Sequence, residues 1–518
     1  MFFHLPILSI LIWLPLAGAV LVLMTGGDQR ASLARGIAVV VALLSFLLCI
    51  PLYLGFDPTS YLMQYREDYL WLTASKIHYA LGIDGISLVM IILTNFTGLL
   101  VILAGLEAVK QRVAQYLAIF LILQAMIIGV FASMDAILFY VFWEGMLIPM
   151  YLIIGMWGSS NRVYASIKFF LYTFFGSILM LVALLYLAQK SGSYSIQSFY
   201  HLPLTLTEQI LLFFAFLLAF AVKVPMWPVH TWLPDAHTEA PTAGSVILAA
   251  LLLKLGVYGF LRFSMPILPL ACQHLSGFMI VLSLIAIVYI GLIAIVQADM
   301  KKLIAYSSIS HMGIATLGCF MAYDLIHDSQ ELQAAYMGLQ GAVIQMVAHA
   351  FSSGAMFFGV GWLAARYYNH SRLIKSYGGV ANTMPVFAAF FMLFALSNVG
   401  LPGTAGFVGE FMVIVGAMHS HFWVALVAAT TLILGASYTL WMYKRVFFGP
   451  VRNDQVASFR DLSAIELINY LLLAAAVLWL GLNPEPIVHV LQATLGHLLA
   501  QSLPYGVAMS PNELSYFA

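Results

Sequence analysis

Charged residues are scarce in this chain: only 8% of its 518 residues are Asp, Glu, Lys or Arg, whereas 63% are hydrophobic. No stretch has the polar composition of a soluble domain, and no basic, aromatic patch of the kind that binds nucleic acid is present. The three cysteines, Cys49, Cys272 and Cys319, are far apart and form no CxxC pair, which excludes an iron-sulfur cluster or a thiolate metal site. We expect them to be buried thiols that behave as small hydrophobic groups.

Apolar segments long enough to cross a bilayer recur from one end of the chain to the other. A helix needs about 20 apolar residues to span the hydrocarbon core. The first segment, Ile7 to Met24, has no basic region before it and is too long for a signal-peptide core, so we keep it as a helix. The sequence predicts an all-α polytopic membrane protein with about 14 transmembrane helices, centred near residues 14, 43, 94, 123, 147, 177, 220, 253, 285, 312, 349, 400, 433 and 473.

The distribution of basic residues predicts the orientation, because Lys and Arg concentrate in cytoplasmic loops. Only Arg66, Lys76, Lys190 and Arg262 are expected on the outer side. Both termini are then predicted on the outer, periplasmic side of a bacterial inner membrane. Lys223 and Lys254 fit neither side and must lie within the membrane. The basic residues expected in cytoplasmic loops are Arg30, Arg35, Lys110, Arg112, Arg162, Lys168, Lys301, Lys302, Arg366, Arg372, Lys375, Lys444, Arg445, Arg452 and Arg460.

Four charged residues lie deep inside apolar segments: Glu144, Lys223, Lys254 and Glu410. An ionised group near the centre of a bilayer costs roughly 2.5 to 3.5 kcal/mol on insertion scales, and such groups usually mark ion or proton pathways. These four residues are therefore the candidate functional site.

Two of the predicted helices are interrupted near a charged residue. Pro225 and Pro228 follow Lys223 and remove two backbone donors, and Gly400-Leu-Pro-Gly-Thr-Ala-Gly406 precedes Glu410. Paired interruptions in two halves are typical of inverted-repeat transporters. A simple packing kink at each point is the alternative.

These interruptions divide the chain into four parts. Three N-terminal helices (1–112) precede a first five-helix repeat (113–265) and a second, inverted repeat (274–448), and a last helix and tail follow (449–518). Each break then falls in the fourth helix of its repeat. Asp135 and Asp299 would each open the second helix of a repeat.

Titratable groups along a helix bundle can relay protons if small changes in wetting or nearby charge alter their protonation. We expect Glu144 and Lys223 to pair and to titrate together; the alternative is a static ion pair that aligns helices. His311 and His349 also lie in apolar helices, and an imidazole can pass a proton between its two nitrogens.

Two further histidines, His230 and His237, flank Asp235 after the first break. We expect them to be water-facing residues at a helix end that support the proton path, rather than metal ligands.

Seven motifs are spread over nearly the whole chain: Phe142-Trp-Glu-Gly-Met146, Phe220-Ala-Val-Lys-Val-Pro225, His230-Thr-Trp-Leu-Pro-Asp-Ala-His237, Ala240-Pro-Thr-Ala-Gly-Ser245, Lys302-Leu-Ile-Ala-Tyr-Ser307, Gly400-Leu-Pro-Gly403 and Gly409-Glu-Phe411. Through these motifs the chain resembles the antiporter-like membrane subunits of respiratory complex I, most of all the subunit M branch, whose mitochondrial counterpart is subunit 4.

The resemblance implies a proton channel in the membrane arm of an NADH:quinone oxidoreductase. Glu144, Lys223, Lys254 and Glu410 match the proton-carrying positions of that family, and His311 and His349 match intervening polar positions. It implies no cofactor in this chain; flavin, iron-sulfur clusters and quinone belong to partner subunits, and antiporter-like neighbours are the expected partners. Alternatives are a subunit of a multisubunit sodium/proton antiporter or of a membrane-bound hydrogenase, and a structural membrane scaffold.

Overall fold

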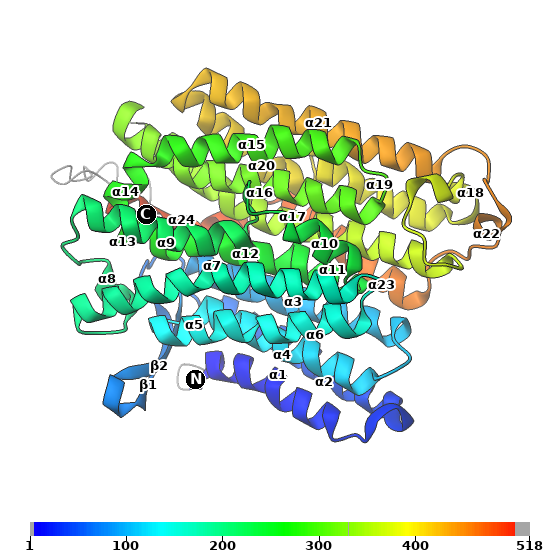
Figure 1. Ribbon diagram of the computed structural model, residues 1–518, viewed down its shortest axis with the longest axis horizontal. Coiled ribbons are helices and arrows are strands. Elements are labelled where there is room, and N and C mark those ends of the chain that lie inside the picture. The colour runs from blue at the N-terminus through cyan, green and yellow to red at the C-terminus, as the bar shows by residue number, and fades with distance from the viewer. Residues whose placement is uncertain (1–4, 330, 503–518) are drawn as a thin grey trace.

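Long apolar helices running roughly along one axis make up almost all of the computed structural model, which describes residues 5–329 and 331–502 (Figure 1). Twelve helical segments of the described chain are long and apolar enough to cross a membrane. Three shorter apolar helices, α1 (Ile7–Leu23), α19 (Pro385–Val399) and α20 (Ala405–Ser420), account for the two remaining predicted spans. The predicted all-α polytopic fold is confirmed.

The helices of the first half of the chain, from α1 to the end of the first predicted repeat, lie within residues 7–267. The helix at 242–267 includes two π-helical stretches, Leu248–Leu252 and Phe260–Ser264. After α1 these helices are α2 (Ala31–Leu54), α3 (Gly85–Ala108), α4 (Val113–Ala132), α5 (Ala136–Gly145), α6 (Leu147–Trp157), α7 (Arg162–Ser191), α8 (Ile196–Phe199), α9 (Leu206–Lys223), α10 (Trp232–Glu239), α11 (Thr242–Ile247), α12 (Leu253–Gly259) and α13 (Met265–Ile267).

The second half of the chain contains the other break, between α19 and α20. A third π-helical stretch, Leu325–Ser329, follows α16. The remaining helices are α14 (Pro269–His274), α15 (Ser276–Ile295), α16 (Met300–Asp324), α17 (Leu332–Arg366), α18 (Val380–Thr383), α21 (Phe422–Phe447), α22 (Asp454–Ala457), α23 (Ala464–Leu482) and α24 (Glu485–Gln501).

The two ends of the bundle differ in structure (Figure 1). One end, here called the hairpin end, carries an antiparallel hairpin of β1 (Gln64–Leu72) and β2 (Ile77–Ile83). The other, here called the basic end, carries α18, α22 and the loops with most Lys and Arg residues. Neither the hairpin nor α24 was predicted. α24 lies across the hairpin end, because Thr494 accepts from the Gly85 amide (3.0 Å) and Tyr336 donates to the Gln492 carbonyl (3.3 Å).

The same backbone motif occurs once at each end of the bundle. Asp135 caps α5 and bridges to Ser195, and Asp299 caps α16 and bridges to Leu373, both in antiparallel fashion. Asp135 contacts the amide of His78 in the hairpin, whereas Asp299 lies at the basic end beside Arg372. Matched motifs at opposite ends are what two inverted repeats produce. The repeat boundaries 113–265 and 274–448 stay a prediction.

The three cysteines are free and buried, as predicted. Each lies among apolar side chains of the helix bundle.

Candidate functional site

The first break places a buried lysine beside a broken helix. α9 ends at Lys223, and regular helix resumes at α10 with Trp232. The Trp232 indole donates to the Val222 carbonyl (2.9 Å) and so satisfies one backbone group that the break frees. The Lys223 side chain is almost fully buried, and its Nζ has no hydrogen-bond partner among the described residues. It lies 5.4 Å from the centre of the Trp143 ring, which gives it a cation–π contact.

Glu144, at the end of α5, is held by a different group from the one we expected. The Ser177 hydroxyl on α7 donates to its carboxylate. Among the described residues no ion pair within 4.0 Å joins it to Lys223, whose Nζ is unpaired. The two residues are therefore not in direct contact in this conformation, although they border the same break and their charges interact electrostatically. Their coupled titration stays a prediction.

The second break has the opposite charge and closer contacts. α19 ends at Val399, and Gly400 and Gly403 adopt left-handed backbone angles (φ +86° and +87°) before α20 begins at Ala405. Glu410 in α20 is 2% exposed. Its carboxylate accepts from Gln345 Nε2 (3.0 Å) and from His311 Nδ1 (2.6 Å).

A line of buried titratable side chains joins the two repeats at the centre of the bundle. Lys254 Nζ donates to the Ala249 carbonyl (2.5 Å) and lies 2.6 Å from Nδ1 of His349. The rings of His349 and His311 are 5.8 Å apart between centroids, and His311 contacts Glu410. We call Lys254, His349, His311 and Glu410 the central line.

Several polar atoms of the central line have no protein partner among the described residues. They are Nε2 of His311, Nε2 of His349 and Oε2 of Glu410. Buried polar groups are normally hydrogen bonded to protein or to ordered water. The two imidazole Nε2 atoms and Oε2 of Glu410 are therefore the atoms of the central line that are free to bind ordered water.

His230 and His237 are not at a water-facing position, contrary to our expectation. Both are buried, with 7% and 0% of their surfaces exposed. The His237 ring stacks on Phe357 at 4.5 Å, and neither of its nitrogens has a partner among the described residues. The break folds α10 back into the bundle, so a residue that follows a helix end in the sequence lies in the interior.

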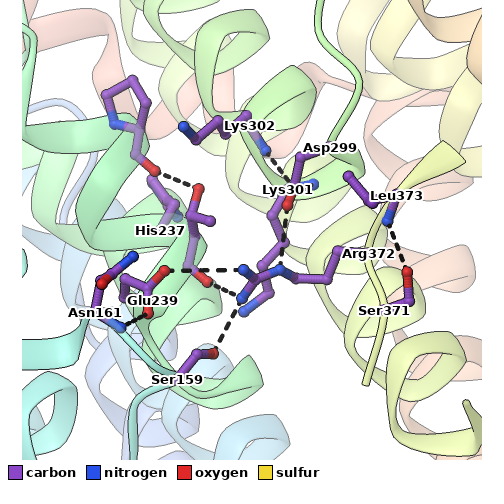
Figure 2. Close-up of polar contacts among 12 residues, drawn as sticks. Ser159, Asn161, His237, Glu239, Asp299, Lys301, Lys302, Ser371, Arg372 and Leu373 are labelled. Carbon is purple, nitrogen blue, oxygen red and sulfur yellow. Dashed lines mark hydrogen bonds and ion pairs between the residues drawn. The ribbon is translucent and has the colours of Figure 1, made fainter. Parts of the chain in front are cut away.

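A polar cluster at the basic end, shown in Figure 2, joins α10 to the second repeat. The guanidinium of Arg372 donates to Asp299 (3.2 Å), Ser159 (3.0 Å) and the Thr238 carbonyl, and it lies 3.8 Å from Glu239. From the sequence, Arg372 was expected to be a charge in a cytoplasmic loop. Its contacts show that it fixes the second half of the broken helix.

Two basic residues that we assigned to loops are also buried. Lys301 lies in the first turn of α16, 4% exposed, and donates to the Ala240 carbonyl (2.7 Å) and to Ser245 (3.1 Å). Arg262 lies in a π-helical stretch near the hairpin end, 8% exposed, and pairs with Asp84 at 2.7 Å. A count of loop charges could not reveal that these two residues are buried, because the helices continue beyond the ends of the apolar segments.

Sequence reasoning also missed the side chains that hold the two glutamates. Gln345 was detectable in principle, because it is a polar residue in the middle of a helix of 35 residues. Ser177 gave no signal, since serine is common on membrane helices.

Comparison with known proteins is consistent with this geometry. Residues 133–435 match the family described as NADH:quinone oxidoreductase/Mrp antiporter, TM. NADH-quinone oxidoreductase subunit M of Rhodobacter capsulatus is 46% identical over 509 residues, covering 95% of this chain and 96% of that protein. NADH-ubiquinone oxidoreductase chain 4 of Marchantia polymorpha is 43% identical over 493 residues, covering 95% and 97%.

A solved structure has the same fold over nearly the whole chain. A chain of respiratory complex I from Thermus thermophilus with bound NADH superposes with a TM-score of 0.85 at 28% identity, covering 96% of this chain and 100% of that one. The chain therefore belongs to the NADH:quinone oxidoreductase/Mrp antiporter membrane family, in its subunit M and chain 4 branch.

Proposed function

We propose that this chain is a proton-translocating membrane-arm subunit of an NADH:quinone oxidoreductase. The observation that carries the proposal is the central line, in which Lys254 is 2.6 Å from His349 and His311 is 2.6 Å from Glu410. Buried ionisable groups in a membrane bundle are expensive and usually functional. The relatives named as subunits of that oxidoreductase support the same conclusion.

The proton enters from the basic end and leaves toward the hairpin end. The positive-inside rule makes the basic end cytoplasmic, in a bacterial inner membrane, with both termini on the opposite side. Glu144 and Lys223 hold the proton at the first break, Lys254 receives it, and His349 and His311 pass it to Glu410 for release. His230 and His237 support the first part of this path.

The energy for transport comes from partner subunits. Moving one charge against 100 mV requires about 2.3 kcal/mol, and in this proposal the oxidation of NADH in the partners supplies it. Its role in the enzyme is that of a translocase subunit without a redox centre, with flavin, iron-sulfur clusters and quinone in the partners. Other membrane-arm subunits, including antiporter-like neighbours, and the lipid bilayer surround it.

The test is NADH-driven acidification of inverted membrane vesicles with a short-chain quinone as acceptor and the terminal oxidases blocked. Lys254→Met removes the titratable group that begins the central line, and we expect acidification to be lost while the complex still assembles. Lys375→Met is the matched control, because Lys375 is exposed at the basic end. Unchanged acidification in an assembled Lys254→Met complex would contradict the proposal.

The family description also includes Mrp antiporters, so a sodium/proton antiporter subunit is the second candidate. Acidification that requires sodium and not NADH would favour it. Normal acidification in Glu144→Gln as well as in Lys254→Met would indicate a scaffold.

A further inference from the structure

A polar cavity of about 500 Å³ lies at the hairpin end, between α24 and the helix at 242–267. Two histidines line it, His201 and His497, together with Asp84, Tyr200 and Arg262. The exposed Tyr61 stacks on His497 at 4.0 Å at the rim. The cavity therefore brings titratable groups from the outer side of the proposed pump close to the interior of the first repeat.

Arg262 lines this cavity, and two of its three guanidinium nitrogens donate hydrogen bonds to neighbouring side chains. Its Nη2 donates to Asp84 (2.7 Å) and to the Ser87 hydroxyl (3.1 Å), and its Nε donates to the Tyr258 hydroxyl (3.2 Å). Asp84 also accepts from the Ser87 amide (2.9 Å) as the cap of α3. The pair is buried, with 8% and 3% of the two residues exposed.

Tyr258 connects Arg262 to the central line. It lies four residues after Lys254 within α12, a spacing that puts these two residues on one helix face about 6 Å apart along the axis. Arg262 follows four residues later, in the π-helical stretch. The Tyr258 hydroxyl donates to the Phe131 carbonyl (3.1 Å) and lies 3.1 Å from Ser87 Oγ. Lys254 is 0% exposed, and Tyr258 lies between it and Arg262 along the helix.

Two members of this connection, Arg262 and Tyr258, do not relay protons in the bonding that the structure shows, whereas the Asp84 carboxylate and the Ser87 hydroxyl can bind or exchange one. A guanidinium stays protonated in proteins, so Arg262 cannot release a proton inward. The single hydroxyl proton of Tyr258 is committed to the Phe131 carbonyl, and its oxygen accepts from Arg262.

We propose that Arg262, Asp84 and Tyr258 form a seal that prevents protons in the outer cavity from returning to Lys254. This inference rests on the proposed function, because a return path matters only if Lys254 carries protons. Arg262 is a positioning residue in this account. Asp84 holds the guanidinium of Arg262 in place, and Tyr258 fills the space between Arg262 and Lys254.

The test measures passive proton flux through the whole complex in proteoliposomes without NADH, driven by a potassium diffusion potential and followed with an entrapped pH dye. Arg262→Gln leaves the Asp84 carboxylate free to bind a proton, and we expect a several-fold rise in flux. Arg262→Met combined with Asp84→Asn removes both charges and should also leak. Tyr258→Phe keeps the aromatic ring and the Arg262–Asp84 ion pair, so it is the variant least able to disturb folding. It should give a smaller rise in proton flux.

Two controls separate a seal from general damage. Arg366→Gln removes a similar arginine, which pairs with Glu466 at 2.5 Å near the basic end. This variant should show the native passive proton flux. Adding Lys254→Met to the Arg262→Gln protein should abolish the leak, which a merely loosened bundle would not show.

The outcomes distinguish the seal from the proposed function. Native flux in the assembled Arg262→Gln or, if that variant does not assemble, in Tyr258→Phe would overturn the seal, and so would a leak that persists with Lys254→Met. Normal NADH-driven acidification alongside either result would leave the proposed function standing. Loss of the proposed function would instead appear as unchanged acidification in Lys254→Met alone.

Discussion

Both broken helices interrupt the helical backbone close to a buried charged residue. They do so with different residue types, and the two charges have opposite signs and different contacts. Two prolines form the first break, after the end of α9, and glycines with left-handed backbone angles form the second. Lys223 at the first break has no hydrogen-bond partner among the described residues, whereas Glu410 at the second contacts both His311 and Gln345.

This difference indicates a division of roles. A buried charge without a partner is unstable, and its protonation responds to small changes in wetting or nearby charge. A carboxylate already bonded to an imidazole is a defined acceptor. We infer that the first break controls when a proton moves and that the second break determines where it goes.

The largest expected effect is at the second break. Glu410→Gln keeps the shape of the side chain and a donor or acceptor for Gln345, but it removes the group that binds the proton. NADH-driven acidification should fall nearly to zero in a complex that still assembles. Glu485→Gln, which changes an exposed carboxylate at the start of α24, should acidify normally. Equal loss in both variants would indicate a general effect of removing acidic residues.

A second experiment asks whether Lys223 acts by titration or by fixed charge. Lys223→Met removes the charge, and Lys223→Arg keeps a charge that is never released. We expect both to lose most of the acidification, measured per NADH oxidised. Normal pumping in Lys223→Arg would show that the first break needs only a static positive charge and would remove the contrast between the two breaks.

A smaller effect is expected from the backbone of the second break. Gly400→Ala must adopt a left-handed angle, which costs about 1 to 2 kcal/mol, and its Cβ would lie 2.9 Å from Leu432 and 3.3 Å from Glu410. Gly26→Ala pays the same backbone cost in open space. Thermal denaturation of the assembled complex should show a larger loss of stability for Gly400→Ala. Equal losses would mean that the neighbours of Gly400 adjust freely.

The smallest expected effect compares the matched helix caps of the two repeats. Removing a cap that accepts two amides costs about 0.5 to 2 kcal/mol, so Asp135→Ala should destabilise the complex modestly. Asp299→Ala should cost more, because the additional partner of Asp299 is the charged Arg372 (3.2 Å), whereas that of Asp135 is the neutral amide of His78 (3.1 Å). Thermal denaturation again provides the measurement. A larger loss for Asp135→Ala would argue that the Arg372 cluster does not depend on Asp299.

The membrane spans, the two breaks and the four buried charges were predictable because each leaves a local mark in the sequence. An apolar run, a Pro or Gly pair and a charge inside an apolar run need no knowledge of tertiary contacts. The contact between His349 and Lys254, 95 residues apart, could be suspected only from their shared burial. The roles of these residues in proton transfer stay predictions.

The rest depends on how segments pack, which the sequence does not encode locally. Lys301 and Arg262 resembled loop charges, yet the helices continue past the apolar runs and bury both. The hairpin of β1 and β2 lies between two predicted spans, and apolar residues do not recur at a regular interval along it. α24 packs across the hairpin end because its apolar face covers α3 and α17, a match that no single segment reveals.

The most direct test of the central line is the ratio of protons moved to NADH oxidised in His349→Leu, because His349 contacts Lys254 on one side and faces His311 on the other. His419→Leu, on a half-exposed histidine at the end of α20, is the matched control and should keep the native ratio. If the central line conducts protons, the His349→Leu complex should assemble and lose most of its proton movement per NADH. A native ratio in that variant would contradict the account.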